Sequence, residues 1–127
     1  MILLDANYIL RFLLKDNLEM YNIAEECILN NECYINNEVM AEVVFVLLKV
    51  YKVSKKDIEK ATVGILNYEN IQMLSKQSMI DTLEIFGSKN LDFVDCILCE
   101  ESKRHTIKTF DKKLLKCINN KKDFTSA

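Results

Sequence analysis

The chain has few of the residues on which many catalytic and binding motifs depend. It contains no proline, two glycines and one histidine. With glycine only at Gly64 and Gly87, neither the dinucleotide-binding nor the P-loop phosphate motif can be built, and the serine nucleophile elbow is also excluded. With His105 as the only histidine, zinc sites that need two histidines are excluded as well.

Long apolar runs and targeting segments are also lacking. The N-terminal run is interrupted by Asp5, Asn7 and Arg11, and it has neither a basic start nor a small-residue cleavage site, so it is not a signal peptide. No stretch approaches the roughly 18 apolar residues of a membrane span. The five cysteines have no disulfide-framework spacing. They predict reduced thiols and a cytoplasmic protein, with Cys96 and Cys99 as core residues.

The size and charge of the chain set further bounds. It has 127 residues, half of them hydrophobic, and a formal net charge of −2. This length predicts a single domain over residues 1–127. A generally basic nucleic-acid-binding surface is excluded, whereas a local basic rim is not.

Short apolar runs alternate with helical patterns along the chain. Strands are predicted at residues 2–5, 33–36, 71–74 and 106–110, and helices at 7–15, 18–30, 38–52, 54–67, 76–86, 91–103 and 111–118. Ser54 is a predicted helix N-cap. The strands do not alternate between apolar and polar residues, which is typical of a parallel sheet covered on both faces. The predicted fold class is therefore α/β.

Four acidic residues lie at positions where an ionised carboxylate would cost free energy if it were buried. Asp5 and Asp111 each follow an apolar strand, at the edge where open parallel sheets bind ligands. Glu42 and Asp95 lie in apolar helical segments that we predict to be largely buried. A buried ionised carboxylate is expensive unless it is paired or binds a metal.

Two interpretations of these acids remain open. Asp5 and Asp111 are natural N-caps of the helices that follow them, and an acid on an apolar helix often lies at its wet edge. If all four converge at one end of the sheet, they repel one another and favour a bound divalent cation. Ligands that are all oxygen favour Mg²⁺ or Mn²⁺ over zinc.

Four motifs, in order, resemble those of the PIN-domain ribonucleases, and most closely the VapC-type toxins of toxin–antitoxin pairs. They are LLDANYILRFLLKD (residues 3–16), NNEVMAEVVFVL (36–47), LDFVDCILCEES (91–102) and TFDKKL (109–114). The resemblance covers nearly the whole chain. It implies a three-layer α/β/α domain with a central, mainly parallel sheet of four to five strands.

The resemblance also implies a site. Asp5, Glu42, Asp95 and Asp111 take the places of the catalytic and metal-binding acids. Asn7 and Thr109 match residues that orient acids or bound water, whereas Ala6 stands where the family more often has a hydroxyl residue. Asp92, three residues before Asp95, is a further acid beside the site, either a peripheral ligand or a rim or N-cap residue, and its position favours the latter.

The implied activity is Mg²⁺- or Mn²⁺-dependent endonucleolytic cleavage of RNA by a metal-activated water. Because an acidic cluster repels RNA, a cationic rim must hold the substrate backbone. The candidates for this rim are Arg11, Lys15, Lys103, Arg104, Lys112 and Lys113. The implied partners are the RNA substrate, a VapB-type antitoxin and a second copy in a homodimer, with no membrane.

Other functions fit the sequence less well. A PIN-like module that binds RNA or protein without turnover is the main alternative, although the presence of all four acids argues against it. A receiver-type phosphoacceptor needs paired acids after its first strand, where this chain has only Asp5. A haloacid-dehalogenase-type phosphatase needs a second aspartate where this chain has Asn7.

Overall fold

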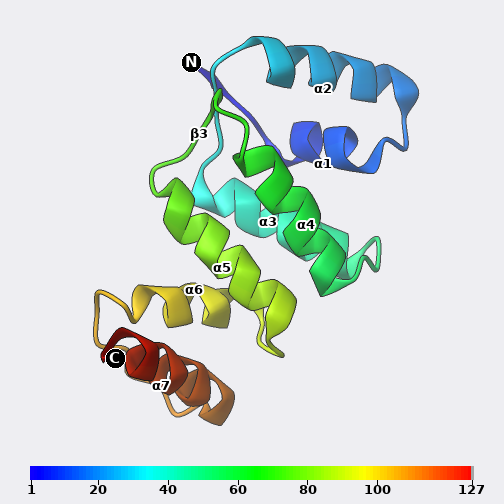
Figure 1. The fold of residues 1–127 in the computed structure, drawn as a ribbon. Helices are drawn as coiled ribbons and strands as arrows, with labels where there is room; N and C mark the ends of the chain where they lie inside the picture. The colour runs from blue at the N-terminus through cyan, green and yellow to red at the C-terminus, as the bar shows by residue number, and fades with distance from the viewer. Residues whose placement is uncertain (127) are drawn as a thin grey trace.

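The computed structural model describes residues 1–126, with side chains described through residue 120. The described residues form three short strands and seven helices (Figure 1). In chain order these are β1 (Ile2–Leu3), α1 (Ala6–Leu14), α2 (Leu18–Asn30), β2 (Cys33–Tyr34), α3 (Asn37–Lys49), α4 (Lys55–Leu66), β3 (Ile71–Gln72), α5 (Lys76–Ser88), α6 (Phe93–Glu101) and α7 (Lys112–Ser126).

The sheet is parallel, with the strand order β1-β2-β3. The amides of Ile2 and Leu4 donate to the carbonyl oxygens of Glu32 (2.9 Å) and Tyr34 (3.0 Å), which fixes β1 against β2. The predicted parallel sheet is thus confirmed for three strands. Each strand is shorter than the apolar run that predicted it.

The predicted fourth strand at residues 106–110 is not formed, so this prediction is wrong. Within the described part of the chain, the segment makes no backbone ladder with β1 or any other strand. Phe110 is fully exposed. A strand requires a neighbouring strand to take up its amides and carbonyls, and the apolar pattern of residues 106–110 does not provide one.

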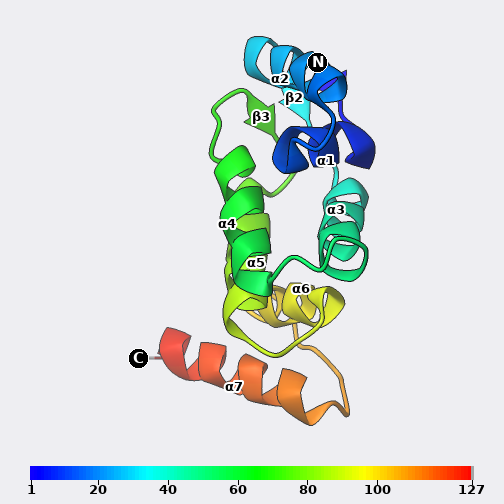
Figure 2. The ribbon, with the colours of Figure 1, turned by 90° about the vertical axis from the view of Figure 1, so that its right-hand side faces the viewer.

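The helices are joined through one hydrophobic cluster. Each of them contributes buried side chains, such as Ile9 from α1, Val43 from α3, Phe86 from α5 and Leu114 from α7. Figure 2 shows the sheet near one end of the molecule and α7 at the other, with α4, α5 and α6 between them. No helix in the described residues is long and apolar enough to cross a membrane.

The helix starts follow from local side-chain chemistry. The hydroxyl of Ser54 accepts a hydrogen bond from the amide of Asp57 (3.2 Å), so the predicted N-cap of α4 is confirmed. Asn17 and Asn36 cap α2 and α3 in the same way. Such caps satisfy amide donors that the first helical turn cannot pair internally.

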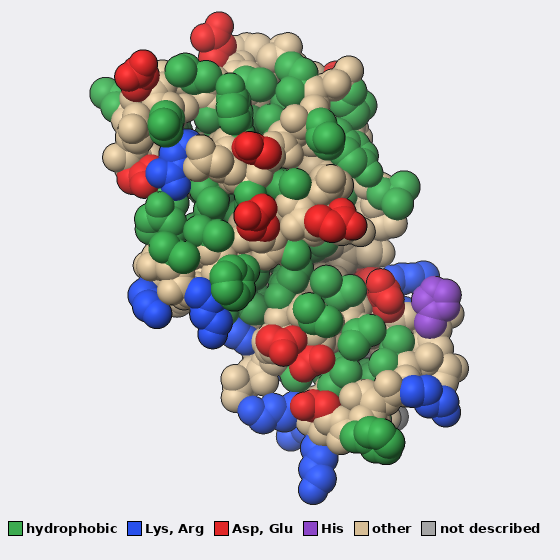
Figure 3. All heavy atoms as spheres, turned by 180° about the vertical axis from the view of Figure 1, so that it is seen from behind, with side chains coloured by type: hydrophobic (Ala, Val, Ile, Leu, Met, Phe, Trp, Pro, Cys, Tyr) green, Lys and Arg blue, Asp and Glu red, His purple; other side chains and the backbone are tan. Residues whose placement is uncertain are grey.

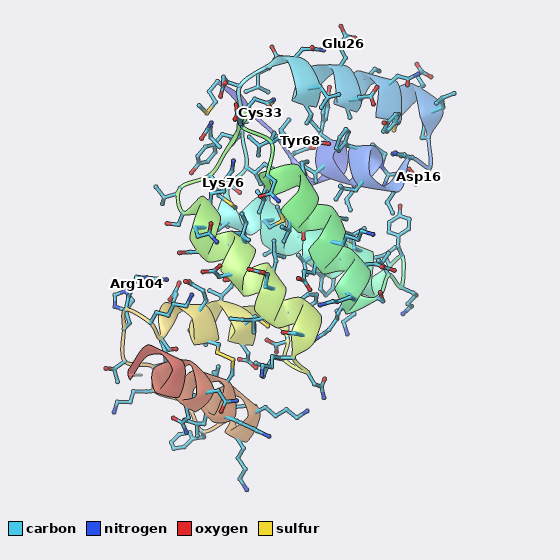
Figure 4. The ribbon with its side chains drawn as sticks, in the orientation of Figure 1. Asp16, Glu26, Cys33, Tyr68, Lys76 and Arg104 are labelled. Atoms are coloured by element: carbon cyan, nitrogen blue, oxygen red, sulfur yellow. A yellow bond between two sulfur atoms is a disulfide. The ribbon has the colours of Figure 1, made fainter. Side chains whose placement is uncertain are left out.

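The cysteines differ from the prediction of reduced thiols. Cys99 on α6 and Cys117 on α7 form a disulfide, seen as the yellow bond between these helices in Figure 4. Their Cα atoms are 6.1 Å apart, within the usual range for a disulfide. The bond depends on two helices meeting in space, which cysteine spacing does not reveal. Cys27, Cys33 and Cys96 are free.

Candidate active-site cleft

A cleft of about 620 Å³ lies where α3 faces the N-termini of α6 and α7. Three carboxylates line it, from Asp92, Asp95 and Asp111. We call these three residues the acidic cluster. Figure 3 shows acidic side chains gathered on one face of the molecule, with lysine or arginine side chains beside them. The cleft therefore combines both charges.

Two members of the acidic cluster are held by helix capping. The carboxylate of Asp92 accepts from the amide of Asp95 (2.8 Å) and caps α6, in agreement with its interpretation as an N-cap. The carboxylate of Asp111 accepts from the amide of Leu114 (2.8 Å) at the start of α7. The hydroxyl of Thr109 accepts from the amide of Asp111 (3.0 Å). Negative charge at a helix N-terminus is favourable, so both positions tolerate an ionised carboxylate.

Asp95 is the electrostatically distinctive member of the cluster. It is half-buried, and burial raises the pKa of its carboxyl group. The neighbouring charges of Asp92 and Asp111 raise this pKa further. Asp95 is thus close enough to Asp92 and Asp111 for their charges to repel its own, and a cation beside it would relieve that repulsion.

Lysines line the same cleft. Lys49 and Lys113 are exposed at its rim, and Lys55 is half-buried. The ammonium group of Lys55 donates to the carbonyl oxygens of Lys89 (3.2 Å) and Leu91 and lies 4.5 Å from the centre of the Phe86 ring. Lys55 therefore ties the start of α4 to the loop that leads into Asp92. The sequence analysis did not identify this role, because the contact spans 34 to 36 residues.

Asp5 and Glu42 are not among the residues that line the cleft. Asp5 is exposed and caps α1, since its carboxylate accepts from the amide of Tyr8 (2.9 Å). Glu42 is exposed, so the prediction that it is buried is wrong. Glu42 stands between Ala41, which lines the cleft, and Val43, which is buried. Its two neighbours thus lie on apolar faces of α3, while the Glu42 side chain lies in solvent.

The four predicted acids are divided between the cleft and positions outside its lining. Among the residues with described side chains, no group of three or more His, Cys, Asp or Glu side chains is arranged to hold a metal ion. The chemistry of the donors fits Mg²⁺ or Mn²⁺, because all are carboxylate oxygens. Of the four, Asp95 and Asp111 line the cleft, whereas Asp5 and Glu42 are not among its lining residues.

Most of the remaining predicted residues lie outside the cleft lining. Asn7 is exposed in the first turn of α1 and does not line the cleft, and Lys15 and Lys112 are exposed as well. Of the six predicted RNA-binding residues, Lys113 alone lines the cleft. Three of the six form ion pairs within the chain, and Figure 4 labels Arg104 and Asp16. These pairs are Arg11–Asp16 (2.7 Å), Lys103–Asp81 (2.9 Å) and Arg104–Glu100 (2.6 Å).

Comparison with known families found that the model of the PIN domain matches residues 2–117 of this chain. The match includes the cleft, all four acids predicted from the sequence and both disulfide cysteines. Comparisons with curated proteins and with solved structures found no match.

Proposed function

Because the chain belongs to the PIN-domain family, we propose that it is a metal-dependent endoribonuclease and the toxin of a toxin–antitoxin pair. PIN domains are generally nucleases. The observation that carries the proposal is the cleft, in which three carboxylates and three lysines line one cavity. Carboxylates bind the cations that hydrolyse phosphodiesters, and lysines bind the phosphates themselves.

In this proposal Asp95 and Asp111 would hold the metal ion in the cleft, and Asp5 and Glu42 would have to reach it from outside the cleft lining. A bound Mg²⁺ or Mn²⁺ would supply an acidified water and offset charge on the scissile phosphate. Asp92 holds the start of α6 and thereby the position of Asp95. Thr109 orients the backbone of Asp111. Lys49 and Lys113 at the rim offset the repulsion between the acids and an approaching RNA strand.

The proposed partners are an antitoxin of the VapB type and a second copy of the chain. Tyr8 on α1 and Phe45 on α3 are exposed, and Phe12 and Leu13 are only partly buried. Exposed apolar side chains of this kind support a protein-binding surface along these two helices. An amphipathic antitoxin segment fits such a surface. We propose a cytoplasmic location for the pair because RNA is found there; the Cys99–Cys117 disulfide removes the separate argument from reduced thiols.

One observation favours a second candidate, a PIN-like domain that binds RNA or protein without cleaving it. Asp5 and Glu42 lie outside the cleft, and the described side chains do not form a metal centre. This arrangement is expected of a domain that has kept the fold and lost turnover. The two candidates differ in whether purified protein cleaves RNA when Mg²⁺ or Mn²⁺ is added.

The test is cleavage of single-stranded RNA by wild type, Asp95→Asn and the matched control Asp57→Asn. Asp57 is exposed on α4 and does not line the cleft. We expect cleavage that needs Mg²⁺ or Mn²⁺ and is abolished by a chelator. Asp95→Asn should cleave on the order of 100-fold more slowly, because metal-based stabilisation of the transition state amounts to several kcal/mol, whereas Asp57→Asn should match wild type.

Two results would contradict the proposal. A wild-type protein that binds RNA but never cleaves it with either metal would favour the non-cleaving module. Metal-dependent cleavage that is undiminished in Asp95→Asn would show that the cleft is not the active site.

A further inference from the structure

A second, smaller cavity of about 260 Å³ adjoins the acidic cleft. One wall is the loop between α5 and α6, and the other is α7. Three of the seven lining residues are lysines, two are asparagines and none is acidic. We call this cavity the basic pocket, and its lining residues are Lys89, Asn90, Leu91, Lys113, Lys116, Cys117 and Asn120.

The basic pocket continues directly from the acidic cleft. Asn90, Leu91 and Lys113 line both cavities. The charges of the two differ, because the cleft has three carboxylates and three lysines whereas the basic pocket has lysines alone. A ligand that spans the two cavities would therefore pass from a lining of both charges to one whose described charged side chains are all lysines.

The two walls of the basic pocket are fixed by contacts outside it. Lys55 holds the loop through the backbone carbonyl oxygens of Lys89 and Leu91, which leaves the Lys89 side chain out of that contact. On the other wall, Cys117 is bonded to Cys99 and fixes α7 against α6. The pocket is thus built by segments far apart in the sequence.

The pocket lysines are available for a ligand. Lys89, Lys113 and Lys116 are exposed, and none of them forms an ion pair with a described side chain. This distinguishes them from Lys103 and Arg104, whose charges are taken up by acids of the chain.

We propose that the basic pocket binds the phosphodiester backbone of an RNA strand whose scissile bond lies in the acidic cleft. This inference rests on the proposed function and names the part of the protein that holds the substrate. Lysines supply point charges for phosphate oxygens, and the asparagine amides supply hydrogen-bond donors. The recognised ligand is thus a chain of phosphates that leaves the cleft along α7.

The shape and lining of the pocket favour backbone over base recognition. Its volume is below the roughly 300–1,000 Å³ that is typical of small-molecule sites. None of its described lining residues has an aromatic side chain on which a base can stack. Binding here should therefore be strongly salt-dependent and independent of RNA sequence.

The test measures RNA binding in EDTA, where metal-dependent cleavage does not occur. The variant is Lys89→Ala, Lys116→Ala, which leaves Lys113 and the acidic cluster intact. The matched control is Lys56→Ala, Lys60→Ala, which removes the same charge from exposed positions on α4 that line neither cavity. Affinity for a single-stranded RNA oligonucleotide is measured across a series of salt concentrations, for two unrelated sequences.

We expect the slope of log affinity against log salt to be shallower by about 1.4 in the Lys89→Ala, Lys116→Ala variant, about 0.7 for each lost phosphate contact. The change should be equal for both RNA sequences, and the control should keep the wild-type slope. Thermal melting of each variant establishes that it is folded.

Three results separate this inference from the proposed function. A shallower slope without any metal-dependent cleavage supports the basic pocket and contradicts the nuclease. An unchanged slope in the variant overturns the basic pocket, whether or not wild type cleaves RNA. No RNA binding by wild type in EDTA also overturns it.

Discussion

Two segments of this chain have the same plan, in which a short apolar run ends at an aspartate and a helix follows. In the first, β1 leads to Asp5 and α1. In the second, residues 106–110 lead to Asp111 and α7. Both aspartates accept a hydrogen bond from the amide three residues ahead, at 2.9 Å and 2.8 Å. Only β1, however, is part of the sheet.

The difference shows which interactions are local. A helix cap needs a side chain and an amide three residues away, so the sequence alone specifies it. A strand needs a second segment, and β1 obtains one from β2, about 30 residues away. In the described structure residues 106–110 have no such partner, and Phe110 stays in solvent.

The C-terminal region is held by other means. α7 packs against α6, its residues Leu114 and Ile118 are buried, and the Cys99–Cys117 disulfide joins the two helices. Asp111 thus caps a helix that a disulfide fixes against α6, whereas Asp5 follows a strand that is held by hydrogen bonds to β2. Disrupting each kind of contact should affect one region and spare the other.

The largest expected effect comes from Cys117→Ser. A disulfide across a sequence separation of 18 contributes about 3 kcal/mol to the free energy of unfolding, mainly by restricting the unfolded chain. We expect urea unfolding under oxidising conditions to show this loss, with amide exchange accelerated in α7 before α3. Reduced wild type should behave like the variant, and Cys27→Ser, which alters a free cysteine, should behave like wild type.

Two results would contradict this prediction. One is equal unfolding free energies for Cys117→Ser and wild type. The other is a loss of amide-exchange protection in α1 and α3 as large as that in α7, which would show that the disulfide does not act on the C-terminal region in particular. The contrast between the two segments would then not hold.

A smaller effect is expected from the two caps. Asp5→Ala and Asp111→Ala should each lower the free energy of unfolding by about 1 kcal/mol, because each leaves a helix amide unpaired. The loss at Asp111 should be the smaller of the two, since removing its charge also relieves repulsion with Asp95. Thermal and urea unfolding without metal measure both values.

The variants Asp5→Asn and Asp111→Asn provide the control, because asparagine caps a helix about as well as aspartate. They should keep most of the stability. A loss of several kcal/mol at Asp5 with none at Asp111 would instead show that capping depends on strand pairing.

Sequence analysis predicted the parts of the fold that depend on short-range chemistry. The three strands that pair, the seven helices and the caps at Ser54 and Asp92 were all predictable, since periodicity and capping act within a few residues. The exposure of Glu42 was not predictable, because the helical segment 38–52 has apolar residues on several sides. Its sequence pattern therefore does not show which residue faces solvent. The unpaired segment 106–110 depends on contacts between distant residues.

The candidate site was predictable to a similar degree. The motifs identified Asp95 and Asp111, which share the cleft, but they also grouped Asp5 and Glu42 with them. Lys55 and Lys89 meet across 34 residues, and Cys99 and Cys117 pair only because α6 and α7 are adjacent. No spacing pattern in the sequence predicts these contacts, because each depends on how distant segments pack together.

The central claim is that the carboxylates around the cleft bind a divalent cation. The most direct test is thermal melting with and without millimolar Mn²⁺, for wild type and for an Asp95→Asn, Asp111→Asn double variant, which removes two cleft carboxylates. A cation that binds only the folded state raises the melting temperature by mass action. We predict a rise of several degrees for wild type and none for the double variant; equal rises in both proteins would contradict the claim and place the metal elsewhere.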